Sequence, residues 1–433
     1  MTTRRGHTRT IRRTVITGVG CISPNGIGRE AYWAALAAGR SGVSRISSFD
    51  TTQSIVKIAA EIKEFNTDLY IPAKDRRHIS RPVPLALAAS EEAWVDAGLV
   101  PIELTLEARR RTGVFFGSGG GPLEFTERQY GFYFNGRKSQ VSVYAIPSST
   151  TGTLSSELSM YYHLHGPSHV ISTGCTSSTD ALGYAAQMIA LGHIDIALAG
   201  GADAPIMPGI MSGFELMKIV TTAWNHAPDK ASRPFSRDRS GIVAGEGAWF
   251  FILEAAESAL ARGAHIYAEL AGYGTSCDAH HRVRLDESGE EPARAMQLAV
   301  TDAGLAVDAI DYINLHGTST QLNDPIETRA VKRCFGKHAF RIPMSATKSL
   351  IGHPQGASGA AGVAAALLAL TKDIIHPTIN LEQPDGECDL DYVPQQARHQ
   401  EIETVLCNCI GFGSKNSALV LRKVSDTEKL ISG

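Results

Sequence analysis

Two distant stretches of this 433-residue chain carry almost the same seven residues. Residues 93–99 read AWVDAGL and residues 299–305 read AVTDAGL, and a short apolar run follows each of them. In both stretches, glycine stands where the end of a helix favours a left-handed residue. The chain therefore contains the same helix-to-strand unit twice, which favours a fold built from two related halves.

Other segments repeat in the same order. TGVG at residues 17–20 and AGYG at residues 271–274 are each expected to end a strand. The run WFFILE at residues 249–254 has its plausible counterpart in ALVLR at residues 418–422. Matches in the same order predict an internal duplication. We expect an N-terminal half over residues 1–260 and a C-terminal half over residues 261–433.

The apolar runs indicate the fold class. They are continuous rather than alternating, as in strands that are buried on both faces, and alanine-rich helical stretches separate them. This pattern is typical of an α/β fold. The N-terminal half is longer because of residues 120–165 and 205–240, which we expect to be excursions that form substrate pockets and subunit contacts.

Composition and charge exclude several classes of protein. The formal net charge is −3, and nothing in its distribution suggests a nucleic-acid or membrane partner. The basic N-terminus has no apolar core behind it, and no apolar run reaches the roughly 18 residues of a membrane helix. The seven cysteines are scattered, and even the CxC pair Cys407 and Cys409 is interpreted as reduced thiols, not as a metal site. We therefore expect a cytoplasmic protein.

Cys175 is predicted to stand at a turn between a strand and a helix. The run SHVI at residues 168–171 has β character, and a helix is expected over residues 180–191. A helix N-terminus carries partial positive charge, which favours a thiolate and lowers the pKa of cysteine. The alternative is a small buried cysteine in a tight turn. Small hydroxyl residues flank Cys175 and leave room for a substrate, which favours a nucleophile.

Two histidines follow in the second half, each beside glycine. His316 ends a strand-like run, where it could shuttle a proton or be a structural histidine bonded to a carbonyl. His353 lies in the glycine-rich turn of residues 348–359, which lacks the GxxxxGK[ST] order of a phosphate-binding loop. The GFG turn at residues 411–413 offers backbone N–H groups of the kind that an oxyanion hole requires.

Together these motifs resemble the β-ketoacyl synthases of the thiolase superfamily, from TGVGCISPNG to GFGSKNSALVL. The resemblance implies the thiolase fold, with mixed sheets layered between helices in the order αβαβα. STGCTSSTDALGYA, RGAHIYAE and ECDLDYVP are most similar to the ketosynthase-α subunits of type II polyketide synthases, whereas HGTSTQLNDPIET is closer to the fatty-acid elongating synthases. Polyketide biosynthesis is the favoured pathway, and fatty-acid elongation is the alternative.

The resemblance also implies roles for named residues. Cys175, His316 and His353 match the catalytic triad, Lys348 matches the lysine of the KSxxGH motif, and Phe412 matches the gating phenylalanine. An acyl chain would move from an acyl carrier protein onto Cys175. A malonyl thioester would then lose carbon dioxide, and the resulting enolate would attack the acyl group. The backbone N–H groups of Cys175 and Phe412 would hold the oxyanion, and the two histidines the enolate.

No cofactor or metal is required, because the phosphopantetheine arm belongs to the carrier protein. Thr318 and Thr320 would be hydroxyl partners for that arm, and Gly120 would leave room for a long acyl chain. Glu327 is expected to give structural support by pairing with Lys348.

Two residues depart from the family pattern. Gly362 replaces an acidic residue, so a hydrogen-bonding group behind the site is missing or comes from elsewhere; Ser414 replaces a glycine and would restrict the Phe412 turn.

We expect a homodimer, or a heterodimer with a chain-length-factor-like subunit. Two other functions stay open at this point. The chain could itself be such a chain-length-determining subunit, although those characteristically lack the cysteine. It could also be a hydrolase with a Cys–His pair, although the lysine motif and the GFG turn argue against that.

Overall fold

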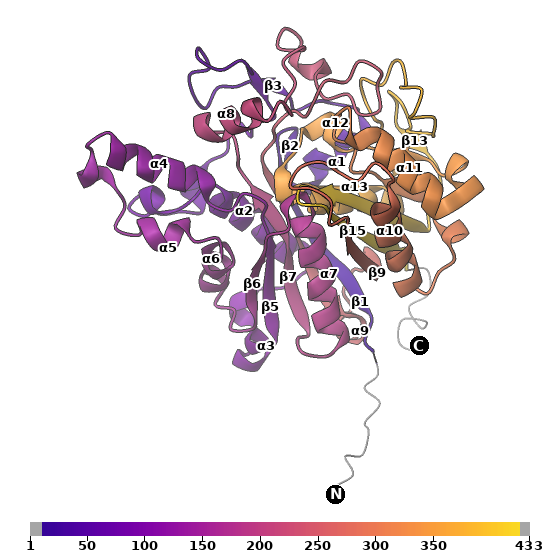
Figure 1. Ribbon diagram of the computed structural model, residues 1–433. Coiled ribbons are helices and arrows are strands. Elements are labelled where there is room, and N and C mark those ends of the chain that lie inside the picture. Colours follow the sequence, from indigo (N-terminus) through magenta and orange to yellow (C-terminus); the bar gives the residue numbers. More distant parts are fainter. Residues whose placement is uncertain (1–10, 425–433) are drawn as a thin grey trace, which may run out of the picture.

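The computed structural model describes residues 11–424, and most of its strands join in one long sheet (Figure 1). The strands of this sheet are β1 (Thr14–Ser23), β2 (Gly26–Ile27), β5 (Thr112–Gly117), β6 (Ser168–Ile171), β7 (Ile196–Asp203), β8 (Gly247–Ala255), β9 (Ala268–Cys277), β10 (Tyr312–Asn314), β11 (Met344–Ser345), β14 (Thr404–Gly411) and β15 (Lys415–Arg422). Two short pairs lie apart, β3 (Ser44–Arg45) with β4 (Ile58–Ala59) and β12 (Ile374–Ile375) with β13 (Arg398–His399).

The strand pairing repeats itself along the sheet. In the first half β6, β5 and β7 are parallel, β8 runs antiparallel to β7, and β1 antiparallel to β8. The second half repeats this scheme: β11, β10 and β14 are parallel, β15 runs antiparallel to β14, and β9 antiparallel to β15. A short antiparallel ladder between β1 and β9, with Val15 opposite Glu269 and Ile16 opposite Ala268, joins the two series. The predicted internal duplication is therefore confirmed by the topology.

The helices lie in three layers around the two halves of the sheet. They are α1 (Arg29–Ala37), α2 (Pro82–Asp96), α3 (Leu106–Arg110), α4 (Leu123–Phe134), α5 (Ala145–Ser149), α6 (Thr153–Tyr162), α7 (Ser177–Ala190), α8 (Pro208–Leu216), α9 (Ala256–Ala261), α10 (Glu290–Asp302), α11 (Asn323–Phe335), α12 (Lys348–Ile351) and α13 (Ser358–Lys372). Helices α7 and α13 contact strands of both halves, whereas α2 packs on β1 and β8 and α10 packs on β9 and β15. This is the predicted αβαβα layering.

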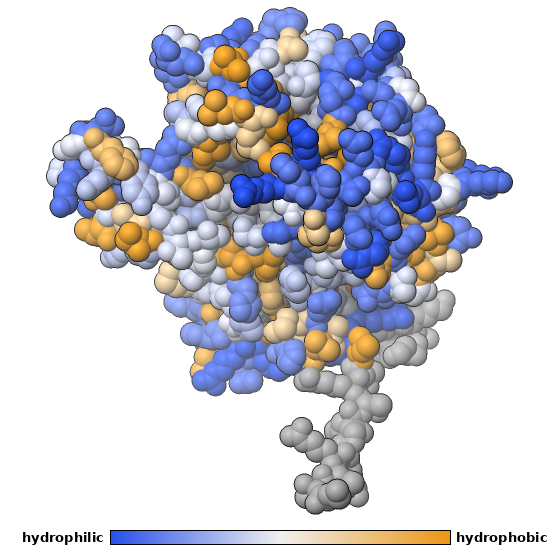
Figure 2. Space-filling view, viewed as in Figure 1, coloured by the Kyte–Doolittle hydropathy of each residue, from blue (hydrophilic) through white to orange (hydrophobic). Residues whose placement is uncertain are grey.

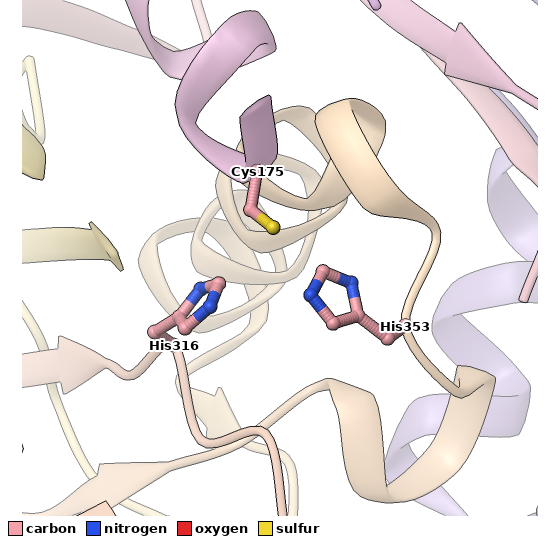
Figure 3. Close-up of side chains that lie close together, drawn as sticks. All are labelled: Cys175, His316 and His353. Atoms are coloured by element: carbon pink, nitrogen blue, oxygen red, sulfur yellow. The ribbon is translucent and has the colours of Figure 1, made fainter. Parts of the chain in front are cut away.

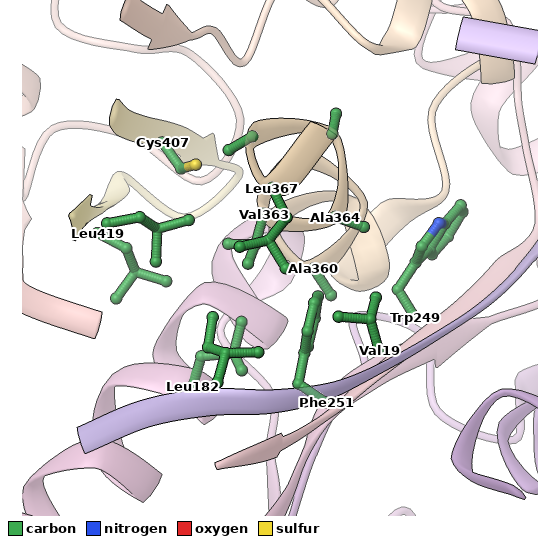
Figure 4. Packing of buried hydrophobic residues seen from close by; sticks show 14 of the residues in the cluster. Val19, Leu182, Trp249, Phe251, Ala360, Val363, Ala364, Leu367, Cys407 and Leu419 are labelled. Atoms are coloured by element: carbon green, nitrogen blue, oxygen red, sulfur yellow. The ribbon is translucent and has the colours of Figure 1, made fainter. Parts of the chain in front are cut away.

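The core is centred on α13, which is rich in small residues. Its side chains are buried from Ser358 to Leu370, and they pack against Val19 and Phe251 on one side and Cys407 and Leu419 on the other (Figure 4). A helix buried all round must be apolar on every face. Its alanines and glycines let both halves of the sheet approach it closely.

The paired glycines lie inside their strands rather than at the ends, so that prediction was wrong. A Cβ atom on Gly18 would lie 2.1 Å from the carbonyl oxygen of Ala93 in α2, and one on Gly272 would lie 2.1 Å from that of Ala299 in α10. The glycines therefore allow α2 and α10 to cross their strands at the same point of each half. After these helices, Gly98 and Gly304 have φ values of 66°, as expected for residues that follow a helix end.

Candidate active site

Three side chains from both halves meet in the interior. Cys175 lies in a 3-10 turn (Gly174–Thr176) directly before α7, His316 follows β10, and His353 lies between α12 and α13 (Figure 3). Their ligand atoms all lie within 4.8 Å of one another, and the centroids of the two imidazole rings are 5.5 Å apart. All three residues are buried. The fold therefore brings together the three residues that the sequence motifs singled out.

The buried surroundings of Cys175 disfavour its thiolate form. Burial raises its pKa to about 11, although the charge of Lys348 and the backbone N–H groups of Phe412 and Cys175 favour the thiolate. The expected lowering of the pKa by the helix N-terminus was therefore wrong, because desolvation of the buried sulfur outweighs it. The same contacts place two N–H donors beside Sγ, which is the arrangement of an oxyanion hole.

Hydrogen-bond partners determine the tautomer of both histidines. Nδ1 of His316 lies 3.2 Å from Nζ of Lys348 and 3.4 Å from Sγ of Cys409, and Nδ1 of His353 accepts the N–H of Gln355 at 3.1 Å. Lys348 Nζ and the N–H of Gln355 are donors, so each Nδ1 is an acceptor and each Nε2 carries the hydrogen, whereas the S–H of Cys409 is given to the carbonyl oxygen of Cys175. Burial and the nearby Lys348 charge lower the pKa of both imidazoles, so both are neutral N–H donors.

These tautomers do not fit a metal ion. Sulfur and two imidazoles are a ligand set that Zn²⁺ accepts, and their atoms are close enough to share one ion. Each Nε2 would have to lose its hydrogen to Nδ1, which would then point an N–H at another donor. The hydrogen bonds at the Nδ1 atoms of both histidines therefore favour donation from Nε2 into the cavity over ligation of a metal ion.

Glu327 and Lys348 hold the turn around His316 from two sides. The carboxylate of Glu327, in α11, accepts the backbone N–H groups of His316 and Gly317 at 2.7 Å each and the side-chain amide of Asn408 at 2.7 Å. The ammonium of Lys348 donates to the carbonyl oxygen of His316 at 2.7 Å. No ion pair within 4.0 Å joins Lys348 and Glu327, so the expected direct pair is wrong. They support the same backbone turn separately.

Asp203 performs the equivalent task for the loop of His353, and the sequence analysis missed it. It ends β7, is fully buried, and accepts hydrogen bonds from Ser118 Oγ (2.6 Å) and from the N–H groups of Gly119 (2.8 Å), Gly120 (3.1 Å) and Gly356 (2.7 Å). Burial raises the pKa of Asp203 to about 6, although the four hydrogen-bond donors favour the charged carboxylate. Asp203 thus ties the loop after β5 to the turn that follows His353. A charged residue ending an apolar strand was the available signal.

Cys409 is the second residue that the sequence analysis did not place. Its Sγ donates to the carbonyl oxygen of Cys175 at 3.1 Å and lies beside His316. The CxC cysteines are both buried and unpaired with each other, as expected. Cys409 therefore supports the backbone of the nucleophile and does not take part in a disulfide.

The triad lies at the inner end of a cavity of about 110 Å³. Apart from the triad it is lined by residues of five segments: Ile219, Ile242, Val283, Arg284, Leu285, Thr318, Thr320, Leu322, Asn323, Ile410, Gly411 and Phe412. Thr318 and Thr320 are thus placed where a substrate would pass, and Phe412 is partly exposed at the lining. Gly120 is not among the residues that line this cavity, and its N–H binds Asp203; its role in an acyl tunnel stays a prediction.

The space opposite Gly362 is occupied by an amide. A Cβ at this position would lie only 2.6 Å from Oδ1 of Asn314, whose Nδ2 donates to Thr347 Oγ1 at 2.9 Å and lies 3.2 Å from Nε2 of His376. Both Asn314 and Gly362 border a small polar cavity that also touches Lys348. The polar group behind the site therefore comes from β10 instead of α13.

Ser414 fixes the turn that carries Phe412. Its φ is 64°, a left-handed value that normally favours glycine, and its side chain is buried. Its Oγ donates to the carbonyl oxygen of His281 at 3.0 Å, and Gly413 N–H donates to that of Arg282 at 2.9 Å. The turn is therefore bound to the segment before α10, which agrees with the expectation that serine restricts it.

Comparison with known proteins covers nearly the whole chain. Profiles described as "Beta-ketoacyl synthase, N-terminal domain" and "Beta-ketoacyl synthase, C-terminal domain" match residues 12–259 and 267–382. A 3-oxoacyl-[acyl-carrier-protein] synthase 2 of Coxiella burnetii is 41% identical over 415 residues, 96% of this chain and 99% of that protein. A putative polyketide beta-ketoacyl synthase 1 of Streptomyces halstedii is 43% identical over 419 residues, 95% of this chain and 98% of that protein.

Solved structures agree. A type II polyketide ketosynthase in complex with its acyl-carrier protein superimposes with a TM-score of 0.87 at 32% identity, over 96% of this chain and 100% of that one. The ishigamide ketosynthase/chain length factor superimposes with a TM-score of 0.87 at 34% identity, over 95% and 99% of the two chains.

Proposed function

Because this chain belongs to the β-ketoacyl synthase family and has the predicted thiolase fold, we propose that it joins an acyl chain held on Cys175 to a malonyl unit carried by an acyl carrier protein. One observation carries this proposal. The Sγ atom of Cys175 meets the Nε2–H groups of His316 and His353 in one buried cavity. One ligand atom of each residue lies within 4.8 Å of the others, and the donors at both Nδ1 atoms leave the Nε2–H groups free to donate. This arrangement suits a nucleophile that must be acylated beside two donors for an enolate oxygen.

In the first half-reaction the acyl group moves from the arm of the carrier protein to Cys175. Sulfur attacks the thioester carbonyl, and the backbone N–H groups of Cys175 and Phe412 stabilise the oxyanion. The C–S bond to the arm then breaks, and the proton of the Cys175 thiol ends on the departing thiol. The high pKa of Cys175 is consistent with a proton that leaves only as the new bond forms.

In the second half-reaction the malonyl thioester loses carbon dioxide. The electron pair of the broken C–C bond forms an enolate, whose oxygen accepts hydrogen bonds from His316 and His353. The enolate carbon attacks the acyl carbonyl on Cys175, and the C–S bond breaks to release the β-ketoacyl product. The sulfur then takes up a proton from water. Neutral imidazoles suit this step because they donate hydrogen bonds to the enolate oxygen without a positive charge that would stabilise the malonyl carboxylate before it is lost.

Type II polyketide biosynthesis is the pathway that we propose. The polyketide relative has the higher identity of the two compared above, and one of the solved structures that match is a type II polyketide ketosynthase. Fatty-acid elongation is the second candidate, supported by the 41% identity to a 3-oxoacyl-[acyl-carrier-protein] synthase 2. Successive condensations without reduction of the keto groups would support the first, and acceptance of only fully reduced acyl chains would support the second.

The proposed partner is a second chain of the same fold, either another copy or a chain-length-factor-like subunit. Strand β6 is an edge of the sheet and packs on α6, and beyond α6 the helices α4 and α5 and the loop between them project from the body with exposed apolar side chains (Figure 2). These side chains include Tyr133, Phe134, Val143 and Ile146. An exposed apolar surface next to an unpaired strand edge is typical of a protein–protein interface. A solved structure that this chain resembles is a ketosynthase/chain length factor.

Two further expectations belong to this proposal. Within residues 11–424 no helix is both long and apolar enough to cross a bilayer, and we place the protein in the cytoplasm. We also keep the division of the chain near residue 260, which falls in α9 between β8 and β9.

Intact-mass measurement after incubation with acyl-carrier protein tests the proposed function. The wild type should gain one acyl group, and Cys175→Ala should gain none while it still releases carbon dioxide from malonyl-carrier protein. An acylated Cys175→Ala variant would contradict the assignment of the nucleophile. A wild type that cleaves malonyl thioester only to malonate would support a hydrolase instead.

A further inference from the structure

We infer that Arg284 is a binding site for the phosphate of a phosphopantetheine arm at the mouth of the Cys175 cavity. This inference rests on the proposed function, because it assumes a thioester substrate carried on such an arm. Arg284 would recognise the negative charge of the arm, whereas the other groups that line the cavity are neutral.

Arg284 differs in charge from everything around it in the cavity. It is the one charged side chain among the described residues that line the cavity, where the other lining groups are apolar, hydroxyl, amide, thiol or neutral imidazole. It is also exposed, so it lies at the solvent end, whereas Cys175 is buried at the inner end. Within residues 11–424 its guanidinium forms no ion pair and no side-chain hydrogen bond. Its five N–H donors are thus available to an anion from solvent.

The backbone that carries Arg284 is held in place. Nδ1 of His281 accepts the N–H groups of Val283 and Arg284 at 3.0 and 3.1 Å. The carbonyl oxygen of His281 in turn accepts the hydroxyl of Ser414, in the turn of Phe412. The base of the Arg284 side chain is therefore fixed relative to the oxyanion hole, which reduces the ordering cost of binding a ligand.

The order of groups along the cavity matches a phosphopantetheine thioester. The thioester carbon must reach Cys175, the amide groups would pass Thr318 and Thr320, and the phosphodiester would remain at the entrance with Arg284. A guanidinium binds phosphate through two parallel N–H groups, which makes it the side chain best suited to this group. In a carrier protein this phosphate is a diester with one negative charge, and in free phosphopantetheine it is a monoester with more, and both offer oxygen acceptors to a guanidinium.

A binding comparison between two small molecules tests this inference without catalysis. Phosphopantetheine and pantetheine differ by the phosphate alone, and their Kd values can be measured by calorimetry on the wild type, Arg284→Ala and Arg282→Ala. Arg282 is an equally exposed arginine in the same segment that does not line the cavity, so its substitution controls for net charge. The wild type should bind phosphopantetheine about tenfold more tightly than pantetheine, which is the factor expected for one charge-assisted hydrogen bond.

The ratio of the two Kd values should fall to about one in Arg284→Ala and stay near ten in Arg282→Ala. In the wild type the ratio should shrink as salt is added, because the site is exposed. A wild type with no preference, or an unchanged ratio in Arg284→Ala, would overturn the inference. If Arg284→Ala weakens only the binding of whole carrier protein, Arg284 contacts the carrier surface and the phosphate site is wrong. A normal ratio in an enzyme that never acylates Cys175 would leave the site standing and refute the proposed function.

Discussion

Asparagine at position 203 would keep the shape of the aspartate but replace one of its two acceptor oxygens by an NH₂ group. Oδ1 of Asp203 accepts from Ser118 Oγ and Gly120 N–H, and Oδ2 accepts from the N–H groups of Gly119 and Gly356. Whichever way the amide turns, at least one backbone N–H faces another donor. The NH₂ group costs least on the Oδ1 side, where the hydroxyl of Ser118 can rotate and only the N–H of Gly120 loses its acceptor, at about 1.5–3 kcal/mol. We expect Asp203→Asn to lower the free energy of unfolding by about 1.5–3 kcal/mol.

The same change should reach the chemistry through His353. Gly356 follows Gln355, whose N–H fixes Nδ1 of His353, so a loosened loop misplaces one of the two donors. A shift of about 1 Å in a catalytic group can reduce a rate by about 10²-fold. Decarboxylation of malonyl-carrier protein by Asp203→Asn should therefore fall by at least tenfold, while acylation of Cys175 changes less.

Asp180→Asn is the matched control. Asp180 is also buried, but its partners are the hydroxyl groups of Thr173, Thr176, Tyr273 and Ser417, which can rotate and accept from the new amide. Denaturant unfolding of both variants should show the larger loss for Asp203→Asn, whose backbone donors cannot turn. If the two losses are equal, the reasoning from fixed donors is refuted.

The remaining predictions concern pH, the histidines, Glu327 and Ser414. Burial raises the pKa of Asp203 to about 6, so its carboxylate becomes protonated as the pH falls below that value. We therefore expect kcat to decrease at acid pH with an apparent pKa near 6. This decrease should be absent in Asp203→Asn. His316→Ala and His353→Ala should each slow carbon dioxide release by about 10²–10³-fold while Cys175 is still acylated; wild-type release by both would contradict the enolate role. Glu327→Ala leaves buried N–H groups without an acceptor and should cost about 3 kcal/mol or more in denaturant unfolding. Ser414→Gly should speed hydrogen exchange both in its own turn and in the segment before α10; a change confined to the turn would show that the two are not coupled.

Periodicity and repeats in the sequence were sufficient to predict the duplicated α/β fold, and the resemblance of the motifs to the β-ketoacyl synthases implied the meeting of Cys175 with two histidines. Each lies in a short motif beside glycine and hydroxyl residues, so the signal is local. The contacts that position these residues are not local. The donors of Asp203 come from the loop after β5 and from the turn after His353, and no spacing in the chain reveals that these loops touch.

Two of the expectations about the active site failed for physical reasons. The helix N-terminus was expected to lower the pKa of Cys175, but the extent of burial decides that balance, and burial is a property of the assembled fold. The Lys348–Glu327 pair was inferred from opposite charges near each other in sequence. In the fold, each group satisfies backbone donors or acceptors of the His316 turn, which stabilises it more directly than an ion pair would.

The repeat extends to the turns before the two central helices. A 3-10 turn centred on Cys175 precedes α7, and a 3-10 turn centred on Gly356 (Gln355–Ala357) precedes α13. Each turn offers a backbone N–H that can hold a negative charge. In the second half this N–H is occupied permanently by the protein's own carboxylate, Asp203. In the first half the corresponding N–H is left for the substrate. The same kind of turn thus holds a structural contact in one half and remains open to transient charge in the other.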